Sequence, residues 1–153
     1  MQLERNRLDI WQKWLIYVLT SLLFVSGAAW FLLDRFVEVE GAFGPAKHPL
    51  QQPLLVTHGT ASFAYLLLIG SLLSRHVSKG WKLSGQRYQA TLLLCIQGLL
   101  ILTVPVMFYV GHEALRELGA NLHLIAGLFL GAILPLHIFL CRRGYLSASL
   151  RGR

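Results

Sequence analysis

Four histidines lie in two apolar segments of the chain, two in each, and each pair falls on one helical face. His58 and His76 are eighteen positions apart, and His123 and His137 are fourteen apart. At about 100° per residue, eighteen steps make five whole turns, and fourteen steps return to within roughly 40° of the start. Histidine is costly in hydrocarbon and is the commonest side-chain metal ligand. Two such pairs in two membrane helices have the spacing needed to hold two haems, one above the other.

The composition predicts an integral membrane protein. Of the 153 residues, 55% are hydrophobic and only 14% are charged, which is far from an average soluble domain. Four stretches without Asp, Glu, Lys or Arg explain this, and each has about the 20 residues needed to cross the hydrocarbon core. Since the connections are short, we expect an all-α fold, an up-down four-helix bundle in one domain spanning 1–153. The expected helices cover about 14–33, 54–74, 88–110 and 120–140.

The first apolar segment could be mistaken for a signal peptide. Its apolar run is longer than a usual signal-peptide core, and the chain starts at Met1. We therefore expect an uncleaved first helix.

The outer connections are expected to be loops. The longer one, 34–53, is rich in Gly and Pro, which predicts an irregular segment rather than a helix. The shorter one is 111–119. His48 and His112 lie in these connections and are expected to face solvent, although His112 is an alternative to one outer ligand.

The up-down topology pairs the four histidines across helices. The second and fourth helices run in the same direction, so His58 pairs with His123 on the outer side and His76 with His137 on the inner side. Eighteen residues rise about 27 Å and fourteen about 21 Å, so helix tilt or a bend at Pro135 must absorb the difference. Two alternatives stay open: the histidines make interhelical hydrogen bonds, or His76 is a solvated loop residue and only one haem is bound.

Three further residues are candidate cofactor contacts. Gly127 lies between the levels of the two fourth-helix histidines, where it would leave room for a porphyrin; an ordinary small-residue helix contact is equally compatible. Arg75 and Arg116 are placed to pair with the propionates of the inner and outer haem. Their positions could also reflect membrane topology alone.

The cysteines indicate how a haem would be attached. Cys95 and Cys141 are isolated, and the chain has no C-x-x-C-H motif. Covalent attachment and iron–sulfur or zinc ligation by clustered cysteines are therefore excluded. The expected cofactors are two non-covalent b-type haems.

Two stretches resemble the small bacterial cytochrome b561-type membrane proteins. They are LVTHGTASFAYLLLIGSLLSRHVSKGW, with His-Gly early, Arg-His late and a following Trp, and FYVGHEALRELGANLHLIAGLFLGAILPLHIF, with two histidines. The resemblance covers roughly 56–139. It implies that His58, His76, His123 and His137 are the haem ligands of an electron-transfer subunit in the bacterial cytoplasmic membrane, linking quinones to a redox partner. The chain departs from the family pattern at 87–90 and after Thr103.

The pattern predicts an electron-transfer subunit of a larger oxidoreductase complex rather than a self-sufficient enzyme. A bis-histidine haem has no open coordination position, so it carries electrons between a quinone pool and a protein partner. The alternative is a haem-free or single-haem membrane anchor or assembly subunit of a redox complex.

The cationic residues are divided unequally between the two sides of the predicted bundle. Eleven of the fourteen Lys and Arg lie in the N-terminal segment, the second connection and the C-terminal tail, against three on the other side (Arg35, Lys47, Arg116). The positive-inside rule then places both termini in the cytoplasm. The net charge of +7 reflects this division and suits anionic lipid headgroups, so a nucleic-acid partner is not expected.

We predict that a reporter fused after Arg153 is active only if it is of the type that works in the cytoplasm. Activity of a reporter that works only in the periplasm would reverse the assigned orientation.

Overall fold

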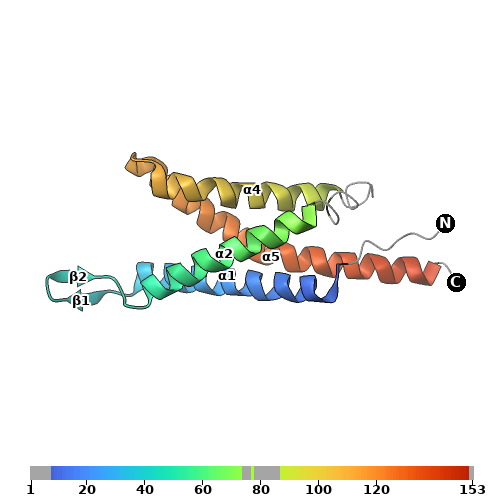
Figure 1. Cartoon of the computed structure of the whole chain (residues 1–153), viewed down its shortest axis with the longest axis horizontal. Helices are drawn as coiled ribbons and strands as arrows, with labels where there is room; N and C mark the ends of the chain where they lie inside the picture. The colour runs from blue at the N-terminus through green and yellow to red at the C-terminus, as the bar shows by residue number, and fades with distance from the viewer. Residues whose placement is uncertain (1–7, 74–76, 78–86, 152–153) are drawn as a thin grey trace. The chain divides into compact units, whose positions relative to one another are not determined.

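The computed structural model of the chain describes residues 8–73, 77 and 87–151, with side chains placed as far as residue 140. In this part the chain is helical apart from one short hairpin (Figure 1). The predicted all-α fold with four membrane-length helices is confirmed. The elements are α1 (Ile10–Phe36), β1 (Val39–Gly41), β2 (Gly44–Ala46), α2 (Gln51–Leu72), α4 (Arg87–Tyr109) and α5 (Glu113–Arg151).

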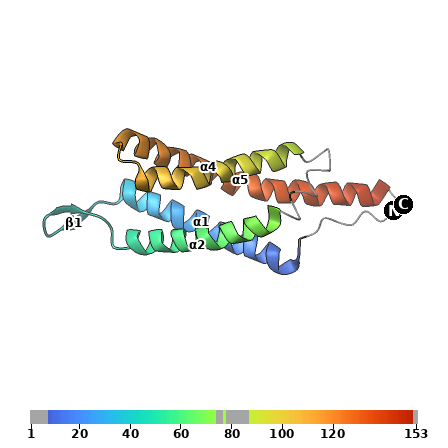
Figure 2. The same ribbon diagram turned by 45° about the horizontal axis from the view of Figure 1, so that its top comes forward.

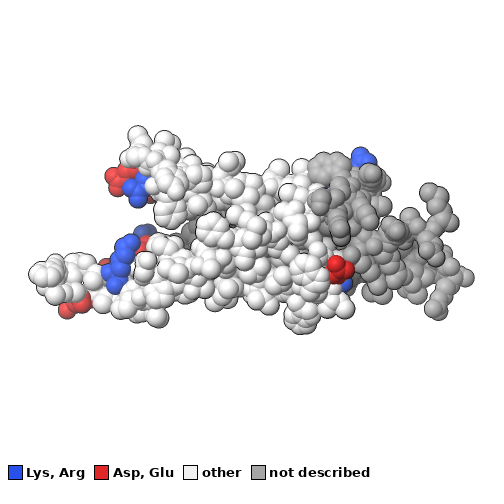
Figure 3. Space-filling view, in the orientation of Figure 1, with Lys and Arg blue, Asp and Glu red and all other residues white. Residues whose placement is uncertain are grey.

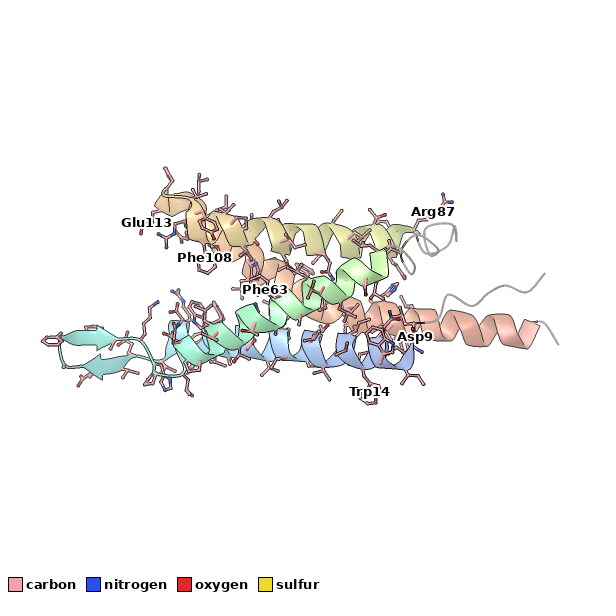
Figure 4. The ribbon with its side chains drawn as sticks, in the orientation of Figure 1. Asp9, Trp14, Phe63, Arg87, Phe108 and Glu113 are labelled. Atoms are coloured by element: carbon pink, nitrogen blue, oxygen red, sulfur yellow. The ribbon has the colours of Figure 1, made fainter. Side chains whose placement is uncertain are left out.

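The four helices have the surface of a multi-pass membrane protein. Each contains a stretch long and apolar enough to cross a bilayer. On the face shown in Figure 3, the described charged side chains lie near the helix ends and leave the stretches between them uncharged. Large apolar side chains point outward: Leu67 is 79% exposed and Trp14 is 65% exposed, directed away from α2 in Figure 4. Such exposure would cost about 25 cal/mol per Å² in water but is favourable in lipid.

The helices α1 and α2 form one antiparallel pair (Figure 2). At one end, Gln51 Nε2 donates a hydrogen bond to Asp34 Oδ1 at 3.1 Å. Seven residues further along α2, His58 contacts Leu23 and Ser26. Residue numbers on α1 thus decrease as those on α2 increase, as expected for antiparallel helices. From His58 onward the buried residues of α2 are spaced three or four apart, which is one helical face. They are Ala61, Tyr65, Leu68 and Leu72.

The helices α4 and α5 form a second antiparallel pair, joined by a short turn. Gly119 of α5 is buried at the closest approach: a Cβ built on it would lie 3.0 Å from Cγ1 of Val106. Further along the same face of α5, Ala126 and Leu130 are buried. Gly119 and Ala126 are small, and this allows the two backbones to come close, as is common between membrane helices.

The connections 34–53 and 111–119 contain more regular structure than the sequence predicts. The first is not irregular: β1 and β2 pair antiparallel, with Gly44 at φ +115°, a conformation that favours glycine. In the second, α5 already begins at Glu113, so most of the predicted loop 111–119 is helical. Glu113 in the first turn complements the positive end of the helix dipole.

The two remaining histidines lie at helix starts. The carbonyl of His112 accepts hydrogen bonds from the backbone N–H groups of Leu115 and Arg116. Nδ1 of His48 accepts one from the N–H of Leu50, just before α2. We expected both to face solvent: His112 is exposed, whereas His48 is partly buried. The contacts assign both to helix N-termini.

We predict that Val106→Cys with Gly119→Cys forms an intramolecular disulfide once Cys95 and Cys141 are replaced by serine. The ideal Cβ at Gly119 lies 3.4 Å from Cβ of Val106, close to the separation of about 3.5–4.5 Å found in disulfides. Mass spectrometry of the non-reduced protein would detect the bond.

The matched control is Gly98→Cys with Gly119→Cys, because Gly98 has no heavy atom within 4 Å of a built Cβ. Equal cross-linking in both variants, or none in the first, would contradict the register of α4 and α5.

Candidate functional site: histidines at the helix contacts

His58 lies at the contact between α2 and α1. Its Nδ1 is 3.0 Å from the carbonyl oxygen of Leu23 and 3.1 Å from Oγ of Ser26. The ring also occupies the space beside Gly27, where an added Cβ would be 3.0 Å from Cε1 and 3.2 Å from Nδ1. Thus α1 provides a hydrogen-bond acceptor, a hydroxyl and a gap without a side chain, all within one helical turn.

His123 lies at the contact between α5 and α4. Its Nδ1 is 2.8 Å from Oγ1 of Thr103. The Thr103 side chain is also within hydrogen-bond distance of two carbonyls of its own helix, Leu99 at 2.9 Å and Leu100 at 3.0 Å. Thr103 is only 4% exposed, so these partners are held away from the surface.

His137 repeats this arrangement fourteen residues further along α5. Its Nδ1 is 3.3 Å from Oε1 of Gln89, which precedes Thr103 by fourteen residues. The two contacts therefore follow one antiparallel register, and fourteen residues correspond to about 21 Å of rise. The predicted common face of His123 and His137 is the face of α5 that contacts α4.

The hydrogen bonds assign the tautomers of two of these rings, His58 and His137. A main-chain carbonyl can only accept, so Nδ1 of His58 donates to Leu23. The amide oxygen of Gln89 likewise accepts from His137. The hydroxyl of Thr103 can accept from Nδ1 of His123 or donate to it, so this contact is compatible with either tautomer. In a neutral imidazole with Nδ1 protonated, the lone pair is on Nε2. That is the nitrogen a metal would bind. A histidine that ligates a metal usually donates a hydrogen bond from its other ring nitrogen, as Nδ1 of His58 and His137 does here.

Of the other predicted site residues, Gly127 and Arg116 belong to the described part of the chain. Gly127 lies in α5 with no heavy atom within 4 Å of a built Cβ, so there is open space beside it. Arg116 is exposed in the first turns of α5. Arg75 and His76 lie outside the described residues. His58 belongs to the α1–α2 pair, whereas His123 and His137 belong to the α4–α5 pair.

The residues of α1 and α4 that contact the histidines were not predicted from the sequence. They are polar or small residues within apolar segments: Ser26, Gly27, Gln89 and Thr103. A signal was available on α4, because Gln89 and Thr103 have the same fourteen-residue spacing as His123 and His137. On α1 the Ser-Gly pair has no such repeat.

Among the described residues, no group of three or more His, Cys, Asp or Glu side chains could hold a bare metal ion. This finding does not bear on haem, because a porphyrin supplies four iron ligands and the protein only one or two. Comparison of the chain with protein-family models, curated proteins and solved structures finds no match.

We predict that Gly27→Ala lowers the thermal unfolding midpoint in detergent, because the new methyl group would press on the ring of His58 and disturb its Nδ1 bonds. Overpacking of this kind typically costs about 1–3 kcal/mol. The matched control is Gly70→Ala in α2, which has open space and should gain helix propensity. A midpoint for Gly27→Ala equal to or above that of Gly70→Ala would contradict the His58–Gly27 contact.

Proposed function

We propose that the chain is a membrane-bound b-type cytochrome that holds two non-covalent haems and transfers electrons between a quinone pool and a redox partner. One haem would have His58 and His123 as axial ligands, and the other His76 and His137. The pairing rests on the order of the histidines along the second and fourth predicted membrane helices, which an up-down topology would make parallel. The proposal includes membership of the cytochrome b561-type family and location in a bacterial cytoplasmic membrane.

The observation that carries the proposal is the shared Nδ1 contact of the three described histidines. Each is half-buried, lies within a candidate membrane span and has Nδ1 within hydrogen-bond distance of a neighbouring helix. At His58 and His137 the partner is an oxygen that can only accept, so Nδ1 donates and the lone pair is on Nε2; the Thr103 hydroxyl allows the same form of His123. This is the form that an axial ligand requires.

The remaining residues fit the same use. The open space beside Gly127 would accommodate the flat face of a porphyrin against α5. Arg116, exposed near the start of α5, could pair with a propionate of the haem at that end, and Arg75 with one at the other. When bound, each haem would supply reversible one-electron chemistry. The chain itself would hold the iron ligands rigidly, which keeps structural change small when the charge changes, and its apolar segments would exclude water.

A second function is favoured by the same hydrogen bonds. A haem-free anchor or assembly subunit would also use its intramembrane histidines to bond helices together, and such bonds contribute about 0.6 kcal/mol on average. In that case Nε2 would have no metal, and the histidines would matter only for stability. The single-haem variant of the first proposal differs only in the role of His76.

We predict about two haems per chain by pyridine haemochrome analysis, with both lost on acid–acetone extraction because neither is covalent. His123→Ala or His58→Ala should remove one haem, and His137→Ala or His76→Ala the other. Loss of one imidazole removes half of the protein ligation of that iron.

The control is His48→Ala, since His48 bonds only at the start of α2 in the described part of the chain. Purified protein without haem would support the anchor function. One haem per chain, unaffected by His76→Ala, would support the single-haem alternative.

A further inference from the structure

Two buried hydroxyl groups occupy corresponding places beside His58 and His123. Ser26 on α1 is 2% exposed and Thr103 on α4 is 4% exposed. Each lies on the helix that packs against its histidine, and each approaches Nδ1, at 3.1 Å and 2.8 Å respectively. The two contacts come from different helix pairs, so the correspondence does not follow from one repeated packing arrangement.

Each hydroxyl lies within hydrogen-bond distance of the carbonyl four residues earlier in its own helix. For Oγ of Ser26 this is Leu22 at 2.6 Å, and for Oγ1 of Thr103 it is Leu99 at 2.9 Å. Nδ1 of His58 donates to the carbonyl of Leu23, so the Ser26 hydroxyl can only accept from it. Iron on Nε2 of His123 would leave the hydrogen on Nδ1, and the Thr103 hydroxyl would then accept from it as well.

This arrangement connects each imidazole to the main chain of the adjacent helix. With iron on Nε2 of His123, the order there would be Nδ1–H to Thr103 hydroxyl to Leu99 carbonyl. At His58, the contact with Ser26 is accompanied by the direct bond to the carbonyl of Leu23 at 3.0 Å. Successive hydrogen bonds polarise one another in a low-dielectric interior. A hydrogen-bond acceptor at Nδ1 makes the imidazole more basic, so that Nε2 donates more electron density to a bound metal.

His137 has a different neighbour at Nδ1. Gln89 offers an amide oxygen at 3.3 Å. Hydroxyl contacts are thus described at the two histidines that the proposed function assigns to one haem, and an amide contact at the described histidine that it assigns to the other.

We propose that Ser26 and Thr103 are positioning residues that fix the Nδ1-protonated form of His58 and His123 and lower the reduction potential of the haem these histidines ligate. The inference rests on the proposed di-haem function. The physical reason is that a more strongly donating imidazole stabilises ferric iron over ferrous iron.

The test is a spectroelectrochemical redox titration of the purified haem-loaded full chain. Thr103→Val keeps the side-chain shape but removes the hydroxyl, and Ser26→Ala does so on α1. Both variants should raise the midpoint potential of the same one of the two haems and leave the other unchanged. The Thr103→Val shift should be the larger, because His58 keeps its bond to Leu23 after Ser26→Ala. Thr103→Ser should restore the wild-type value.

The matched controls are Thr91→Val and Ser62→Ala. Their hydroxyls bond to carbonyls of their own helices, Arg87 and Gly59, and neither bonds to a histidine in the described structure. A potential shift in a control equal to that in Thr103→Val would assign the effect to loss of any hydroxyl and overturn the inference.

The remaining outcomes also decide the question. If Thr103→Val loses one haem while Thr103→Ser keeps both, the hydroxyl is required for ligand positioning and the inference stands. If both Thr103 variants lose it, or if Thr103→Val and Ser26→Ala retain both potentials, the inference fails while the di-haem function stands. Wild-type protein without haem would remove the proposed function itself.

Discussion

A polar group inside hydrocarbon must find a partner within the protein, and this constraint organises the described contacts. An unpaired polar atom in an apolar medium costs several kcal/mol. Each described intramembrane histidine meets the requirement at Nδ1, through a partner on the helix packed against its own. The position of a histidine on one helix therefore fixes which residue of the next helix must be polar. At His58 and His137, where the partner can only accept, the helix register also decides the tautomer of the imidazole.

Small residues make these hydrogen bonds possible by bringing the helices close. Gly27 leaves the space that the ring of His58 occupies, and Gly119 lets α5 approach Val106 one turn before His123. In lipid, helix association gains little from the hydrophobic effect, so close van der Waals packing and a few polar contacts must provide it. A glycine near a histidine thus serves both the packing and the chemistry of the contact.

The use of one ring nitrogen for support leaves the other with the lone pair. This division of roles suits an electron carrier, because an axial ligand held from behind moves little when iron changes its oxidation state. It also suits a purely structural contact, in which Nδ1 alone matters. The two functions differ in whether Nε2 binds a metal, and this difference decides the colour of the purified protein.

The sequence by itself determined the fold class and the ligand candidates. Uninterrupted apolar stretches of about 20 residues predict membrane helices whatever their neighbours, and the spacing of His123 and His137 depends only on the pitch of a helix. Their common face on α5 is confirmed by the contacts with α4.

The tertiary structure alone decided the partners of the histidines. Ser26 and Thr103 become neighbours of imidazoles only through the register of the helices in each antiparallel pair. It also decided the hairpin between α1 and α2 and the early start of α5 at Glu113. Gly and Pro at 34–53 signal a break in a helix, but cross-strand pairing between Val39 and Ala46 depends on contacts that no local pattern specifies.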